Sequence, residues 1–420
     1  MEPSSAVQPP SKRQKLWLFW LKYWFLFGLA FAIGLAAAYP PLPSLLRSDI
    51  TVSYVVVALI FLLSGLSLKS RVLVDAALSW RITLFIQVFS LLLCPLFGFG
   101  LVKLLLLIDG FSLDLAIGLA VALATPTTIS SNVLMTKQCG GNESASLVSS
   151  PCSFTFLQVN AVVGNVIGVF VSPSIIFLIL RNISPDAQFG MTPTIVSHKA
   201  SISYSNVFLK LGITVIAPLV LGQILQYIFP RTSMRITSNT VAPLSIINSC
   251  LLLILIWAVM GKTFASDAFT MVPPASLVAV LFLDLAVFGT ACAAAFGGAR
   301  AVNLVSRRCR NADTASSSSS PSHGETFTKR DTASIVLCGA TKTVALGIPM
   351  INVIFEGSAS IGVISLPLLI YHAEQLVAGQ LIVGALEKWI SREDQAVENA
   401  DAETPQEIED NSVVEGESEK

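Results

Sequence analysis

Two apolar stretches of this chain are interrupted by polar residues in the middle of what would otherwise be membrane helices. The first, Leu115–Gly141, breaks at the sequence TPTT (residues 125–128) and stays polar through residues 130–132. The second, Ile335–Phe355, breaks at the sequence TKT (residues 341–343). A broken helix exposes backbone N–H and C=O groups that lipid cannot satisfy, so it persists only where it lines a cavity inside the protein. Two such breaks predict a transporter with its substrate site between them.

The composition places the rest of the chain in a membrane as well. Of the 420 residues, 53% are hydrophobic and only 12% are charged, whereas soluble domains carry roughly 25% charged residues. Apolar runs of about 20 residues, long enough to cross a bilayer as a helix, recur along the sequence. We therefore predict an all-α polytopic membrane protein with ten spans: residues 17–38, 50–66, 82–108, 113–136, 154–180, 207–229, 241–260, 274–299, 333–355 and 361–386.

The positive charges alternate from one connection to the next. Eighteen Lys and Arg residues lie on one predicted side and six on the other, with Lys342 and Lys420 left out of the comparison. Because cytosolic loops carry the excess of positive charge, both termini are predicted to be cytosolic. Ten spans divide into two halves that enter the membrane from opposite sides, which places the fourth and ninth spans, the broken ones, at equivalent positions. This pattern predicts two inverted five-helix repeats whose discontinuous fourth and ninth helices cross.

The charge pattern also separates the ends of the chain from the membrane region. Residues 393–420 hold 11 Asp and Glu against a single Lys, which is typical of a solvated tail. The predicted organisation is a cytosolic N-terminus (1–16), spans one to eight (17–299), a cytosolic serine-rich loop (300–330), spans nine and ten (331–388) and a disordered acidic cytosolic tail (389–420).

Several classes of function have no support in the sequence. The seven cysteines are scattered and form no CxxC pair, so neither a disulfide framework nor a zinc site is expected. The sequence contains no Walker loop, no HExxH motif and no nucleophile elbow, which are the marks of common enzyme and ATPase sites. We therefore expect no enzyme activity, no cofactor, no metal site and no nucleic-acid partner. Membrane lipid and a small-molecule or ion substrate are the expected partners.

The polar residues of the first break are suited to two kinds of ligand. Hydroxyl and amide oxygens, together with carbonyls freed by Pro126, are hard ligands for a cation or a hydrogen-bonding solute. The helix that restarts after the break would point its positive end at the same place, which suits an anion. The alternative is that these side chains only cap the broken helix and pack against its neighbours.

Lys342 is the most informative single residue. A lysine near the middle of the membrane costs at least ~2.5 kcal/mol, so it must face a cavity or a partner. Glu374, Asp284 or carbonyls of the fourth span are the candidate partners. The lysine could act as a fixed cation, bind an anionic substrate, exchange a proton, or serve only as a structural tether.

Further polar side chains lie in the other spans. His372 and Gln375 are three residues apart in the tenth span and therefore share one helix face, expected beside the ninth span. Asp284 is an intramembrane carboxylate, a residue type that is usually functional. Interhelical hydrogen bonds of about 0.6 kcal/mol account for Gln87, Asn160 and Asn165 without a role in transport.

Several of these motifs together resemble a known family. They are GLAVALATPTTISSNVLMTKQCGGNESASL, GATKTVALGIPM and SLPLLIYHAEQLVAGQLIVG. They resemble the bile acid:sodium symporter superfamily, in its branch of the seventh solute-carrier member and the fungal regulators of calcium uptake. The resemblance implies a ten-span fold with a core domain, which contains the crossing helices, and a smaller panel domain that moves against it. The crossing-site residues that it implies are Thr127, Thr128, Ser131, Asn132, Lys342, Thr343, His372 and Gln375.

The resemblance also implies a role in calcium homeostasis by limiting calcium influx, at the plasma membrane or in the Golgi and secretory pathway. Sodium-coupled members of the superfamily place acidic and amide ligands where this chain has Lys342. A lysine ammonium there would take the place of a sodium ion and repel one, which argues against sodium coupling. Three readings stay open: a sodium- or proton-coupled carrier of an organic anion, a regulator that acts through a partner calcium channel, and a membrane scaffold.

Overall fold

The computed structural model describes most of the membrane region but not residues 1–11 or 404–420 at the two ends of the chain. The described residues are 12–45, 51–67, 80–128, 135, 152–183, 204–229, 241–265, 270, 272–314, 326–356, 358 and 360–403. Within these residues the regular structure is helical throughout, as predicted for a polytopic membrane protein. Seven helices are long and apolar enough to cross a membrane, and three shorter apolar helices cover residues 27–38, 54–66 and 113–124. The count of ten spans and the inverted repeats stay predictions.

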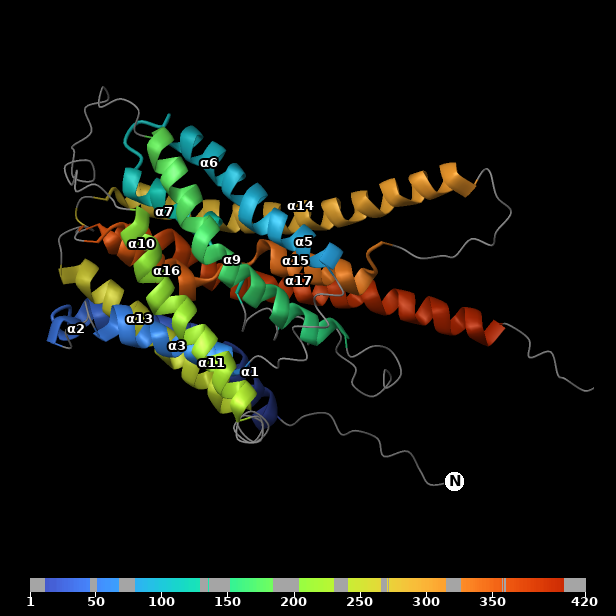
Figure 1. Ribbon diagram of the computed structural model, residues 1–420, viewed down its shortest axis with the longest axis horizontal. Coiled ribbons are helices and arrows are strands. Elements are labelled where there is room, and N and C mark those ends of the chain that lie inside the picture. Colours follow the sequence, from blue (N-terminus) through green and yellow to red (C-terminus); the bar gives the residue numbers. More distant parts are fainter. Residues whose placement is uncertain are drawn as a thin grey trace, which may run out of the picture.

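The helices form two groups that lie side by side (Figure 1). The first group consists of α1 (Lys12–Ala38), α2 (Leu42–Leu45), η1 (Thr51–Val56), α3 (Val57–Ser67), α10 (Tyr204–Leu211), η3 (Gly212–Ile216), α11 (Ala217–Ile228) and α13 (Val241–Ala265). The second group consists of α5 (Trp80–Val88), η2 (Phe89–Leu93), α6 (Cys94–Leu105), α7 (Leu113–Ala124), α9 (Cys152–Ile183), α14 (Pro274–Thr314), α15 (Lys329–Ala340), α16 (Val344–Ile354) and α17 (Ile361–Glu403). The elements marked η are π-helical turns, which are wider than α-helical ones.

Small residues bring the helices of each group into backbone contact. In the first group α3 packs on α11 through Gly65 and Gly222, where a Cβ on either glycine would overlap a carbonyl oxygen of the facing helix. In the second group α7 packs on α17 through Gly118, where a Cβ would overlap the carbonyl oxygen of Ile364. Close packing of this kind holds helices together in lipid, where no hydrophobic driving force acts between them.

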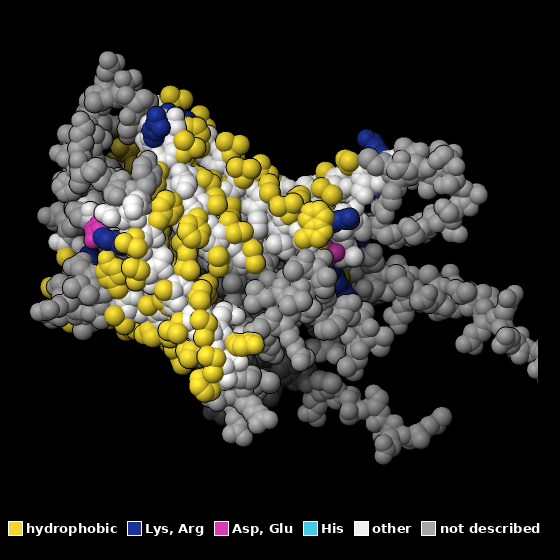
Figure 2. Space-filling model, viewed as in Figure 1, with side chains coloured by type: hydrophobic (Ala, Val, Ile, Leu, Met, Phe, Trp, Pro, Cys, Tyr) yellow, Lys and Arg dark blue, Asp and Glu magenta, His cyan; other side chains and the backbone are white. Residues whose placement is uncertain are grey.

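The outer surface of the helices is apolar. Phe31, Phe282 and Leu104 are among many large hydrophobic side chains exposed on it. Figure 2 shows hydrophobic side chains spread over the visible flank, with Lys and Arg near its ends rather than along its middle. In contrast, the segment that contains α15 and α16 is almost entirely buried. An apolar exterior around a central helix with polar residues is the arrangement expected of a bundle embedded in lipid.

Two helices run farther than the apolar sequence predicts. The spans predicted to end at residues 299 and 386 belong to helices that continue to Thr314 in α14 and to Glu403 in α17. Both helices project beyond the rest of the bundle on the right of Figure 1. The extension of α17 is rich in Glu and Ala, which are good helix formers. The rest of the predicted serine-rich loop, at 315–325, and residues 404–420 of the predicted tail lie outside the described residues.

Candidate functional site

The two sequence breaks meet inside the second group of helices. Helix α7 ends at Ala124 and α15 ends at Ala340, and each is followed by a threonine in extended conformation. The backbone N–H of Thr343 donates to the carbonyl oxygen of Pro126 over 2.9 Å. The hydroxyl oxygens of Thr127 and Thr341 lie 3.0 Å apart and share a hydrogen bond. The breaks therefore satisfy part of each other's exposed backbone, which lipid could not do.

A glycine on a neighbouring helix makes room for this meeting point. Gly168 of α9 faces Pro126, and a Cβ at this position would lie 2.8 Å from Cγ of the proline ring. Asn165, one turn earlier on α9, donates from Nδ2 to the carbonyl oxygen of Thr127 over 3.2 Å. Helix α9 thus supports the first break through both its shape and a hydrogen bond.

The main chain of Lys342 is held by one side chain of α17. The backbone N–H of Lys342 donates to Oε1 of Gln375 over 2.7 Å, and Nε2 of Gln375 donates to the carbonyl oxygen of Lys342 over 2.9 Å. Nε2 of Gln375 also lies 2.6 Å from Nδ1 of His372. Nδ1 also lies 3.3 Å from the carbonyl oxygen of Lys342. Because an amide nitrogen only donates, the shorter contact with Gln375 assigns Nδ1 as the acceptor and the ring proton to Nε2 of His372. His372 and Gln375 share the face predicted for them.

The side chain of Lys342 turns toward η2 rather than toward a carboxylate. Its ammonium donates to the carbonyl oxygen of Ser90 over 2.8 Å and lies 3.0 Å from the Ser90 hydroxyl. Lys342 is 0% exposed. The partners suggested from sequence, Glu374, Asp284 and carbonyls of the fourth span, are not the ones that it has.

The backbone of η2 explains why the Ser90 carbonyl is available. In an α-helix this carbonyl would accept from the N–H of Cys94, but in η2 that N–H donates to Phe89. In a π-helix it would accept from residue 95, which is a proline and has no N–H. Ser90 therefore offers an unpaired carbonyl oxygen inside the bundle, and the Lys342 ammonium satisfies it.

The candidate residues differ in where the structure places them. Lys342, His372 and Gln375 form one hydrogen-bonded cluster, and Thr127 and Thr343 belong to the contact between the breaks. Thr128 is buried beside Thr127. Ser131 and Asn132 lie outside the described residues.

Sequence reasoning missed Ser90 and Asn165 as neighbours of the site. Asn165 was interpreted as an ordinary interhelical contact, and in fact it reaches the first break. Gln87 of α5 donates to Asn160 of α9, which is the interhelical bonding expected of both. A proline five residues after a polar residue in an apolar span was the signal that could have identified Ser90.

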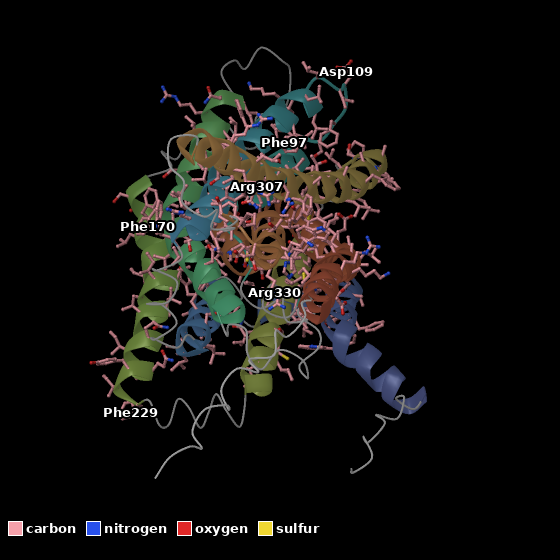
Figure 3. The ribbon with its side chains drawn as sticks, turned by 90° about the vertical axis from the view of Figure 1, so that its right-hand side faces the viewer. Phe97, Asp109, Phe170, Phe229, Arg307 and Arg330 are labelled. Atoms are coloured by element: carbon pink, nitrogen blue, oxygen red, sulfur yellow. The ribbon has the colours of Figure 1, made fainter. Side chains whose placement is uncertain are left out.

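The edge of the site touches the first group of helices. The ring of Phe25 in α1 stands edge-on to the ring of His372, with 5.8 Å between the centroids. In Figure 3 the labelled Phe170 and Phe229 lie at the rim, far from the crowded centre of the bundle. Among the described residues, no three His, Cys, Asp or Glu side chains come together in a way that could hold a metal ion. The arrangement provides hydroxyls, carbonyl oxygens and the side-chain nitrogen of one fully buried lysine, Lys342.

Comparison with known proteins gives a consistent result. The profile of the SBF-like CPA transporter family matches residues 23–388. Solute carrier RCH1 of Candida albicans is 29% identical over 91% of this chain and 92% of its own length. Sodium/bile acid cotransporter 7 of Mus musculus is 30% identical over 88% of this chain and 94% of its own length.

Proposed function

Because the chain belongs to the SBF-like CPA transporter family, we propose that it is a secondary-transporter-like membrane protein that limits calcium influx into the cytosol. The family is one of transporters, and membrane lipid and an ion or small-molecule substrate are its partners. The calcium role rests on the resemblance to fungal regulators of calcium uptake. Such a protein could limit calcium influx without carrying calcium itself by acting on a partner calcium channel.

The proposed topology is ten spans in two inverted five-helix repeats, with both termini cytosolic. The domain boundaries are those of the sequence: 1–16, 17–299, 300–330, 331–388 and 389–420. The division of the helices into two groups supports a core domain and a smaller panel domain. We place the protein in the plasma membrane, with the Golgi and secretory pathway as the alternative.

One observation carries the proposal, namely the contact between two interrupted segments at a buried polar point. The contact joins Pro126 and Thr343, which lie far apart in the sequence but side by side in the bundle. Unwound backbone at this depth is characteristic of the substrate site of secondary transporters. The proposed crossing-site residues are Thr127, Thr128, Ser131, Asn132, Lys342, Thr343, His372 and Gln375.

The position of the Lys342 ammonium supports a carrier without sodium coupling. It is fully buried and bound to the Ser90 carbonyl and hydroxyl oxygens, which are the kinds of oxygen that a hard cation would otherwise coordinate. A second positive charge in the same place would be repelled strongly, because the surroundings screen charge poorly.

The test is the rise of cytosolic calcium after an external calcium pulse, in cells that lack this protein. The cells are complemented with the wild type, Lys342→Ala, Lys342→Met, or a chain that ends at Arg392. Lys103→Ala is the matched control, because Lys103 is exposed on α6. We expect the wild type and the control to reduce the rise and both Lys342 variants to fail, at equal abundance in the membrane.

Two results would contradict the proposal. If no version of the chain changes the calcium rise, the calcium function is wrong. If both Lys342 variants work and only the truncated chain fails, the acidic tail is the regulator and the crossing is not needed.

The second candidate is a sodium- or proton-coupled carrier of an organic anion. The observation that favours it is the start of α16 at Val344, two residues after Lys342. The positive end of a helix and a fixed ammonium both attract anions. Uptake of radiolabelled taurocholate into cells that express the chain, with sodium or with choline outside, tests this candidate. Uptake equal to that of cells without the chain would count against taurocholate as the anion.

A further inference from the structure

Asp284 is a carboxylic acid with no hydrogen-bond partner in the interior of the second group of helices. It is 0% exposed, and neither Oδ1 nor Oδ2 has a hydrogen-bond partner. It lies in the apolar part of α14, one turn before Phe288, whose ring packs edge-on against Tyr371 of α17 with 5.8 Å between centroids. The carboxyl group therefore belongs to the interface between α14 and α17, which run side by side in Figure 1.

An ionised carboxylate in this setting would be very unfavourable. Burial of a charge costs several kcal/mol unless a partner of opposite charge and additional hydrogen bonds offset it. The Lys342 ammonium is bonded to Ser90 and not to Asp284. A bound cation or a proton must therefore accompany the carboxyl group for it to be accommodated.

The groups around Asp284 favour the proton over a metal cation. Those that interact with it electrostatically are Glu374 and Tyr371 of α17, and Tyr371 in turn interacts with Cys94 of α6 and Cys292 of α14. All of them are acids, and none carries a positive charge. The Tyr371 hydroxyl donates its hydrogen to the carbonyl oxygen of Ala340 over 2.7 Å. Among the described residues, Asp284 also belongs to no group of three His, Cys, Asp or Glu side chains that could hold a metal ion.

Tyr371 connects this carboxyl group to the crossing. Its hydroxyl binds Ala340, the last residue of α15 before the break at Thr341. Its ring packs on Phe288 of α14, one turn from Asp284. A change of charge on Asp284 would therefore act on the side chain that holds the start of the break. Glu374, half-buried and with Oε2 unpaired, lies on the same helix and is the second acid on this path.

We propose that Asp284 is a proton-binding site, and that the proton it exchanges is the coupling ion of the transport cycle. The coupling part rests on the proposed function as a carrier, whereas the proton site does not. An O–H bond forms at Asp284 when a proton arrives from water and breaks when the proton returns to water on the other side, so no other reactant is needed. The proton takes the role of the coupling ion, because the Lys342 ammonium would repel a sodium ion from the crossing.

The first measurement is infrared difference spectroscopy on the purified full-length chain in lipid nanodiscs. The spectra of the wild type minus Asp284→Asn are compared in H₂O and D₂O, in sodium buffer and in choline buffer. We expect a protonated-carboxyl band that moves in D₂O, is independent of sodium and disappears at high pH. Asp331→Asn is the control, because Asp331 is a capping residue near the surface. Its difference spectrum should lack this band.

The second measurement is the calcium-pulse assay with Asp284→Asn, which mimics the protonated state. We expect this variant to lose calcium control while it is inserted normally, and Asp331→Asn to retain it. Absence of the infrared band, or its loss on addition of sodium, overturns the proton site. A band together with full calcium control by Asp284→Asn overturns the coupling role. A band in a wild-type chain that itself does not affect calcium contradicts the proposed function and leaves the proton site standing.

Discussion

Gln375 is the residue that most directly fixes the shape of the break at Lys342. Its amide binds both the N–H and the carbonyl oxygen of Lys342, which lies between α15 and α16. Both backbone groups are buried, and without Gln375 neither would have a hydrogen bond of comparable length. One side chain therefore replaces two of the hydrogen bonds that a continuous helix would have made.

Substitution of Gln375 should therefore destabilise the protein. Gln375→Ala leaves two buried backbone groups unpaired, at about 1–3 kcal/mol each. We expect a clear fall in the unfolding temperature of the purified chain, measured by intrinsic fluorescence. Gln380→Ala is the control on the same helix, because Oε1 of Gln380 has no partner to lose. Equal shifts for the two variants would show that Gln375 does not hold the break.

Part of this site could be predicted from single residues, and part could not. Pro126 and the polar residues on each side of Lys342 interrupt apolar sequence, so both breaks were visible, and the spacing of His372 and Gln375 gave their common face. The contact between Lys342 and Ser90 depends on how η2 packs against the break. Pro95 marks the Ser90 carbonyl as lacking a backbone donor but does not say which distant side chain will meet it, and carboxylates were the more obvious choice for an ammonium.

Among the elements, two of the three described π-helical turns, η2 and η3, are built in the same way. In each, the residue after the turn donates its N–H to the first residue of the turn, and a proline follows, Pro95 in α6 and Pro218 in α11. Both turns therefore leave one carbonyl oxygen without a backbone donor, at Ser90 and at Ile213. Only the carbonyl of Ser90 receives a lysine.

Pro95→Ala should release Lys342 from its partner. The new N–H at position 95 would compete for the Ser90 carbonyl, and stability should change little because Pro95 lies in the first turn of α6, where proline is tolerated. We expect Lys342 to react faster with an amine-reactive reagent, as measured by mass spectrometry, with little loss of thermal stability. Pro218→Ala is the matched control and should leave the reactivity unchanged. Unchanged reactivity in Pro95→Ala as well would contradict this account of the turn.

At the scale of the whole molecule, a surface ion pair joins the two groups of helices. Lys210 of α10 forms an ion pair with Glu356, which follows α16, and it is the only ion pair between described residues. The two side chains are 34% and 61% exposed, so the pair contributes only about 0–1 kcal/mol. Such a pair can bias the relative position of the groups without preventing their movement.

Loss of this ion pair should change the balance between arrangements of the two groups more than the stability of either. A bias of about 1 kcal/mol changes a population ratio by about fivefold. Spin labels at Tyr227 of α11 and Leu304 of α14, both exposed, report the distance between the groups in a background without reactive cysteines. Lys210→Ala should broaden or shift this distance, and the exchanged pair Lys210→Glu with Glu356→Lys should restore it.

The control for this measurement is Lys103→Ala, since the Lys103 ammonium donates to the backbone of Asn182 within one group. The distance should be the same in this variant as in the wild type. An identical distance distribution in Lys210→Ala would mean that the ion pair does not bias the two groups.

Gln375 contacts the main chain of residue 342 and not its side chain, which has a consequence for how such proteins can evolve. The pairing uses only backbone atoms, so it can form with any amino acid except proline at that position. A substitution at position 342 can therefore remove the positively charged side chain and leave space for a dissolved ion. The surrounding helices need not change. The shape of the crossing therefore depends on residue 375, whereas its charge depends on residue 342.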